Sequence, residues 1–118
     1  MAGAIHAGWR GLAKGVIENF LKCTKEFPPE KVFIGPSIGP CCYRVGEEVA
    51  VLFKPHVRMG YLDLRSKAVN IFKDHPTAEV KIETLNWCTF CSGKGLPSFR
   101  REGEKALRMI SSVVLLKT

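Results

Sequence analysis

The chain has 118 residues, of which 46% are hydrophobic and 25% are charged, and this composition excludes a disordered protein. The length suits one domain, which we expect over residues 1–118. No apolar run approaches the roughly 20 residues of a membrane helix, and residues 1–6 lack the features of a signal peptide, so we expect a cytoplasmic protein. The net charge of +7 favours an anionic partner. The basic residues form no stripe with interleaved aromatic residues, which argues against nucleic acid.

Hydrophobic periodicity predicts the elements of the first half of the chain. We expect a strand over Ala2–Ile5 and then a helix that begins near Leu12 and ends before Pro28. Lys31–Ile34 is predicted as a buried strand, because it is apolar and is bounded by a Gly-Pro step. The segment 34–40 contains two Gly-Pro steps, which predict a rigid extended loop.

The second half of the chain continues the alternation of helices and strands. We expect helices over residues 45–53 and 64–74, the second of them stopped before Pro76. Glu79–Glu83 alternates like a strand, and Met109–Leu116 is strongly β-prone. The interleaved order predicts the α/β class.

The most informative motif lies at residues 6–11, His-Ala-Gly-Trp-Arg-Gly. It follows a predicted strand and precedes a predicted helix, and loops at strand ends of α/β sheets are where ligands usually bind. His6 can therefore be read as a catalytic residue, either a zinc ligand or a general base. The alternative is a half-buried histidine whose ring nitrogens bond to the backbone.

The chain has five cysteines, which we expect to be reduced thiols because their number is odd and no export signal is present. Cys88 and Cys91 have the CxxC spacing of half a zinc site or of a redox pair, and buried thiols are the simpler reading. Cys41 and Cys42 are adjacent, and adjacent cysteines ligate one metal awkwardly. A cysteine hydrolase with Cys41 or Cys42 as nucleophile and His6 as base is a further option.

Several motifs appear together in a fixed order, at residues 6–11, 34–46, 63–64, 85–91, 98–103 and 108–112. In this order they resemble the laccase-domain family, which is YfiH-like and was once called multicopper polyphenol oxidases. The resemblance implies an α/β fold in which a layered mixed β-sheet is sandwiched by helices. It also implies a zinc-dependent purine nucleoside phosphorylase with adenosine deaminase and methylthioadenosine phosphorylase activities.

The resemblance further implies a zinc site of two histidines and one cysteine. His6 matches the third ligand, whereas one histidine and the cysteine of the family lie upstream of this motif, so the chain resembles the C-terminal portion of the family fold. Cys41 and Cys42 are possible substitutes for the missing ligands, with His56 and His75 further along. A partner chain could also supply ligands, and we expect exposed sheet edges to favour a partner or self-association.

Arg10, Arg100 and Arg101 are the predicted substrate-binding residues, because phosphorolysis needs a bound phosphate and guanidinium groups match phosphate oxygens. The alternative for each is a solvated surface arginine. The aromatic residues Trp9, Tyr43 and Phe99 could stack a purine or lie in the core.

The predicted substrates are a purine nucleoside and phosphate, and the predicted cofactor is zinc. Copper is less favoured, because the chain has only three histidines and copper oxidases use many. The alternatives to a nucleoside phosphorylase are a polyphenol oxidase and a non-catalytic binding remnant of the fold.

Overall fold

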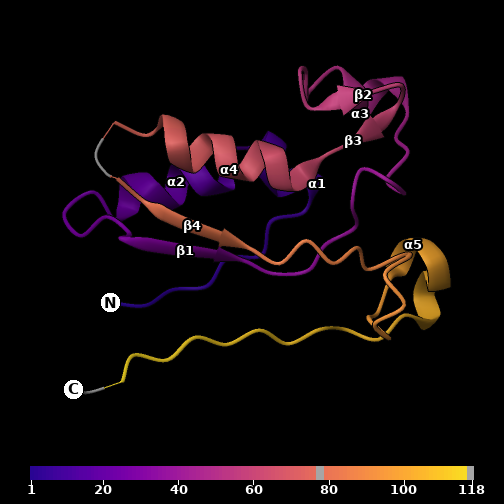
Figure 1. Ribbon diagram of the computed structural model, residues 1–118. Helices are drawn as coiled ribbons and strands as arrows, with labels where there is room; N and C mark the ends of the chain where they lie inside the picture. The colour runs from indigo at the N-terminus through magenta and orange to yellow at the C-terminus, as the bar shows by residue number, and fades with distance from the viewer. Residues whose placement is uncertain (77–78, 117–118) are drawn as a thin grey trace.

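The computed structural model describes residues 1–76 and 79–116 and places helices against one face of a small parallel sheet (Figure 1). Its two strands are β1, Lys31–Ile34, and β4, Lys81–Thr84. They pair in parallel, with Lys31 opposite Lys81 and Ile34 opposite Thr84. A parallel pair requires a crossover connection, which here includes the longest helix of the described residues. The predicted α/β class is confirmed.

The other elements are helices and one hairpin. The helices are α1 (Trp9–Ala13), α2 (Val16–Cys23), α3 (Glu47–Ala50), α4 (Leu64–Asp74), α5 (Phe99–Glu102) and the 3-10 turn η1 (Gly103–Lys105). The hairpin joins β2 (Val57–Arg58) to β3 (Tyr61–Leu62) in antiparallel register. Within the described residues, no helix is long and apolar enough to cross a lipid bilayer.

The structure confirms the predicted helix over residues 64–74 and divides the helix predicted to begin near Leu12. Helix α4 has the predicted bounds, because the Asp63 side chain accepts a hydrogen bond of 3.1 Å from the Ser66 backbone at its start and Pro76 follows its end. The helix predicted to begin near Leu12 is instead two helices, α1 and α2. Gly15 separates them with a φ of 85°, a left-handed conformation that ends the first helix.

The hydrophobic core lies between the helices, the hairpin and one face of the sheet. Phe53 and Leu62 are fully buried at its centre, and the sheet contributes Val32, Ile34 and Ile82. The prediction that Lys31–Ile34 is a buried strand is wrong on one face, because the side chain of Phe33 points away from the core and is 65% exposed. Successive side chains of a strand alternate between its two faces, so only every second residue reaches the helices.

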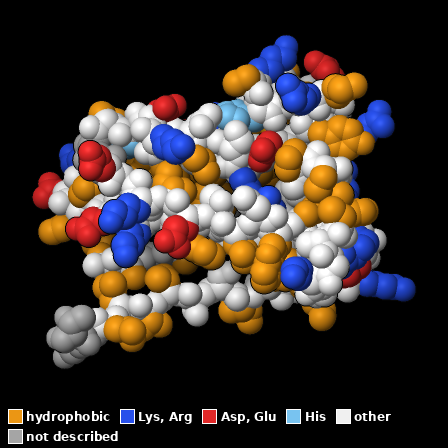
Figure 2. Space-filling model, viewed as in Figure 1, with side chains coloured by type: hydrophobic (Ala, Val, Ile, Leu, Met, Phe, Trp, Pro, Cys, Tyr) orange, Lys and Arg blue, Asp and Glu red, His pale blue; other side chains and the backbone are white. Residues whose placement is uncertain are grey.

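Two predicted strands do not form. Ala2–Ile5 and Met109–Leu116 both lie in the described part of the chain, and neither pairs with a strand. Met109–Leu116 runs extended below the sheet (Figure 1). Its apolar side chains are exposed, and Ile110 is 96% exposed. Figure 2 shows hydrophobic side chains gathered along this lower side of the molecule. A β-prone segment needs a neighbouring strand for its hydrogen bonds. The partner chain or self-association that would supply one stays a prediction.

Candidate functional site

The His6 motif forms the entry to α1. His6 itself is exposed, and Gly8 is the residue that precedes the helix, in an extended conformation. The guanidinium carbon of Arg10 lies 4.6 Å from the centre of the Trp9 ring, so Arg10 is positioned by a cation–π contact. His6 lies in the irregular segment that precedes α1, and its exposed imidazole is open to a ligand. The catalytic and metal-binding roles of His6 stay predictions.

The two arginines of α5 have different surroundings. Arg100 is exposed, and its guanidinium carbon lies 5.1 Å from the centre of the Tyr43 ring. Tyr43 is only 8% exposed and belongs to the core. The geometry therefore places Tyr43 among the packing residues, and Arg100 covers its outer face. Phosphate binding by Arg10 and Arg100 stays a prediction.

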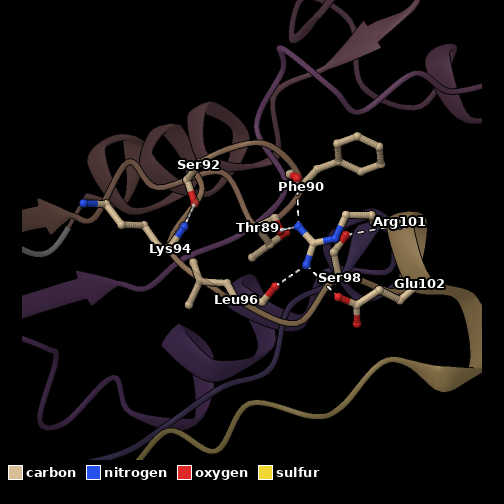
Figure 3. A network of polar contacts seen from close by, with 8 residues as sticks. All are labelled: Thr89, Phe90, Ser92, Lys94, Leu96, Ser98, Arg101 and Glu102. Carbon is tan, nitrogen blue, oxygen red and sulfur yellow. Dashed lines mark hydrogen bonds and ion pairs between the residues drawn. The ribbon is translucent and has the colours of Figure 1, made fainter.

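Arg101 is occupied by contacts within the protein (Figure 3). Its Nη1 atom donates to the backbone oxygens of Thr89 and Phe90 at 3.1 and 2.8 Å, and Nη2 donates to the Leu96 oxygen at 2.7 Å. Nη2 also lies 2.6 Å from a carboxylate oxygen of Glu102. These contacts give Arg101 a structural role in holding the loop after β4 against α5, and its predicted role in binding substrate is untested.

The structure brings four cysteines together. The sulfur atoms of Cys41, Cys42, Cys88 and Cys91 all lie within 4.8 Å of one another, so the group could hold a metal ion. Cys41 and Cys42 follow β1, whereas Cys88 and Cys91 follow β4. From the sequence, Cys41 and Cys42 are a disfavoured second half of a zinc site, because adjacent cysteines ligate one metal awkwardly; the structure nevertheless brings all four sulfur atoms together. The available signal was that both pairs follow strands that pair in parallel, whose carboxyl ends meet at one edge of the sheet.

Arg65, which sequence reasoning also missed, ties the two cysteine loops together. Its Nη2 atom donates to the backbone oxygen of Ser37, after β1, at 2.8 Å and to that of Trp87, after β4, at 2.7 Å. Ser37 also pairs with Cys88 in an isolated parallel bridge beyond the sheet. The parallel pairing therefore continues from the strands to the edge of the cysteine group.

The thiols of this group differ in acidity. Burial opposes ionisation of Cys88, but backbone N–H groups of Gly39, Cys91 and Phe90 outweigh it and lower the pKa of this thiol to about 6. Partial desolvation and the hydrogen bond with Cys91 raise the pKa of Cys41, and the same two causes raise the pKa of Cys42. A cysteine nucleophile needs a lowered pKa, so these values argue against a hydrolase that uses Cys41 or Cys42.

A shallow hollow of about 320 Å³ lies between α4 and the loops that follow β1 and β4. Most of the residues that line it are polar, among them Asp63, Arg65, Ser66 and Asn86. None of the residues predicted to bind substrate lines it. A second hollow of about 280 Å³ shares Asp63 and Ser66 with the first and is lined by His56 as well.

His56 is a partly buried histidine whose Nδ1 atom lies 2.9 Å from Ser66 Oγ. Burial lowers the pKa of this imidazole below its ordinary value of 6.5, and the positive charge of Lys67 lowers it further, while Asp63 partly opposes the shift. Between 6.5 and the lowered pKa, the unfolded chain binds a proton at His56 that the folded chain does not. The folded state therefore loses stability as the pH falls through this window.

We expect the variant His56→Asn to weaken this pH dependence, because asparagine can bond to Ser66 but does not titrate. The measurement is the free energy of unfolding by urea at about pH 7.5 and about pH 5, on either side of the ordinary histidine pKa. The control variant is Asn19→Ala, at an exposed position whose side chain does not titrate, and its change in the free energy of unfolding between the two pH values should match that of the unmodified chain. If the free energy of unfolding changes by the same amount between the two pH values in His56→Asn and in the unmodified chain, His56 does not cause the pH dependence.

Comparison with known proteins identifies the family. The family model described as multi-copper polyphenol oxidoreductase laccase matches residues 1–116. A purine nucleoside phosphorylase of Aquifex aeolicus is 39% identical over 97% of this chain and 56% of its own length. The YfiH purine nucleoside phosphorylase of Escherichia coli is 30% identical over 96% of this chain and 50% of its own length.

A third relative carries a different name. The adenosine deaminase RL5, from an unknown prokaryotic organism, is 29% identical over 92% of this chain and 48% of its own length. The chain thus spans about half the length of the curated relatives it matches. No solved structure gives a significant match. The match of the family model over nearly the whole chain confirms the resemblance that the motifs predict, and the chain belongs to the multi-copper polyphenol oxidoreductase laccase family.

Proposed function

We propose that this chain contributes to a zinc-dependent purine nucleoside phosphorylase, with His6 as its catalytic residue. The observation that carries the proposal is the similarity of nearly the whole chain to relatives named purine nucleoside phosphorylase, which includes the motif of residues 6–11. The exposed imidazole of His6 and the exposed guanidinium of Arg10 stand four residues apart at the start of α1. A proton-transferring group and an anion-binding group are what phosphorolysis requires.

The reaction exchanges one bond for another. A phosphate oxygen forms a bond to C1′ of the ribose, the bond from C1′ to the purine nitrogen breaks, and the purine leaves with the electron pair and takes up a proton. Arg10 and Arg100 would hold the phosphate oxygens, and His6 would hold or move the proton of the bound nucleophile. Catalytic zinc uses three protein ligands, and the described residues do not gather two further ligands around His6. The group of possible ligands that the described residues assemble does not include His6.

The test is the appearance of ribose 1-phosphate from inosine and adenosine, in the 118-residue chain and in any longer protein that contains it. We expect phosphate-dependent product formation, and we expect His6→Ala to lower its rate on the order of 100-fold or more, the usual contribution of an acid–base group. Lys14→Ala removes an exposed charge of the same segment and is the matched control.

Three outcomes would contradict this proposal. Equal rates for His6→Ala and Lys14→Ala would remove His6 from catalysis. A complete lack of turnover in every form tested would favour a non-catalytic binding role. Because one relative is named adenosine deaminase, the assay also follows conversion of adenosine to inosine without phosphate. Deamination that depends on His6 while phosphorolysis is absent would replace the proposed reaction by the deaminase reaction.

A further inference from the structure

We propose that Cys41, Cys42, Cys88 and Cys91 form a structural Zn²⁺ site that is separate from the site of His6. The first argument is distance. The Sγ atoms of Cys41 and Cys91 are 3.6 Å apart, and all four sulfur atoms lie within 4.8 Å of one another. Zinc–sulfur bonds of about 2.3 Å in a tetrahedron place neighbouring sulfur atoms about 3.8 Å apart. The observed sulfur–sulfur distances, from 3.6 Å up to 4.8 Å, include this value. Small side-chain movements therefore suffice to bind the ion.

The turn after Gly39 shows how two adjacent cysteines can reach one ion. The backbone N–H groups of Cys42 and Tyr43 both donate to the Gly39 oxygen, at 3.1 and 3.0 Å, and curl the chain around this residue. A Cβ atom on Gly39 would lie 3.2 Å from the Cys41 sulfur and 3.7 Å from the Cys88 sulfur. The glycine therefore leaves the space in which the sulfur atoms from the two loops approach each other.

The surroundings of the group suit the negative charge of a zinc tetrathiolate, which is −2 in total. The Gly39 N–H group donates to Cys88 Sγ at 3.2 Å, a contact that stabilises a thiolate and orients it. The guanidinium groups of Arg65 and Arg101 lie against the backbone of the loop that carries Cys88 and Cys91. The positive charge of Arg65 beside the loop offsets part of the charge of the centre, whereas the charge of Arg101 is paired with Glu102.

A disulfide between Cys41 and Cys91 is the competing chemistry. A disulfide uses two sulfur atoms and leaves Cys42 and Cys88 without a role, whereas one tetrahedral ion uses all four. Four thiolates from two loops are typical of structural zinc, which leaves no position open for a substrate. The ion would lock the loop after β1 to the loop after β4, beyond the last residues of the parallel pair.

The experiment loads the reduced chain with Zn²⁺ alone, removes the excess by desalting and measures zinc per chain. We expect about one zinc, retained in His6→Ala and in Cys23→Ser, since Cys23 is an exposed free cysteine on α2 outside the group. We expect Cys88→Ser and Cys91→Ser to weaken binding at least about 100-fold, because even the loss of an outer contact to a ligand costs up to this factor. Retention in His6→Ala separates this site from the proposed catalytic one.

A second measurement uses the unmodified chain, because a cysteine variant can fail to fold for other reasons. Zn²⁺ should protect the four clustered cysteines from alkylation and leave Cys23 reactive, as read by mass spectrometry of the peptides. The proposal is overturned if Zn²⁺ protects no thiol of the group, or if zinc is lost in His6→Ala and retained in Cys88→Ser. It is also overturned if the chain purified without reductant holds a Cys41–Cys91 disulfide and the reduced chain binds no zinc.

Discussion

Replacing Phe53 with alanine is expected to lower the free energy of unfolding by about 3–5 kcal/mol, the usual cost of truncating a buried phenylalanine. Phe53 is 0% exposed and lies in the core cluster with Val49 and Leu62. The loss has two parts: the ring no longer leaves water on folding, and a cavity remains because closely packed neighbours relax only partly. In a chain of 118 residues this is a large share of the total stability, which is marginal in most domains.

The measurement for Phe53→Ala is equilibrium unfolding in urea, followed by circular dichroism. Phe27→Ala is the matched control, because the Phe27 side chain is 72% exposed and its loss should change the free energy of unfolding by no more than about 0.5 kcal/mol. Similar losses for the two variants would show that Phe53 does not lie at the centre of the core.

Replacing Arg65 with methionine is expected to lower the free energy of unfolding by about 2 kcal/mol. Methionine keeps much of the apolar stem but leaves the backbone oxygens of Ser37 and Trp87 without the donor that now reaches them at 2.8 and 2.7 Å. The Nε atom of Arg65 is buried and has no hydrogen-bond partner among the described residues. The substitution removes that unfavourable group, and this limits the expected loss.

Arg65→Met should also separate the two cysteine loops, so thiol alkylation gives a second readout. We expect Cys88, which is buried in the folded chain, to react faster in the variant. Arg58→Met, at an exposed position of β2, is the control and should leave both stability and reactivity nearly unchanged. If Arg65→Met matches Arg58→Met in both readouts, Arg65 does not hold the loops together.

The sequence predicts a helix or strand well where the residues that start it, pack it and end it are all close together in the chain. Helix α4 has a capping aspartate, an apolar face and a proline after its end, and its bounds agree with the prediction. The strands β1 and β4 are found within two residues of their predicted positions, because short β-prone runs lie between loop residues. The helix predicted from Leu12 is divided at Gly15, whose left-handed conformation no periodicity reveals.

Prediction fails where an element needs a distant partner. Met109–Leu116 has strong β propensity but no neighbouring strand among the described residues, so it is extended and exposed. Phe33 was expected to be buried because its neighbours are apolar, but helices cover only the face of the sheet to which it does not point. Both errors arise because β propensity reports packing against neighbours that a sequence does not identify.

The α/β class, the motif around His6 and the family can all be read from the amino-acid sequence, since they depend on residue order and on nearest-neighbour preferences. In contrast, the three-dimensional fold is needed to see that Cys41 and Cys91, 50 residues apart, have their sulfur atoms 3.6 Å from each other. The fold is likewise needed to see that the guanidinium groups of Arg65 and Arg101 bond to backbone oxygens. These contacts arise because the parallel register of β1 and β4 fixes which loops meet, and burial of the whole core stabilises that register.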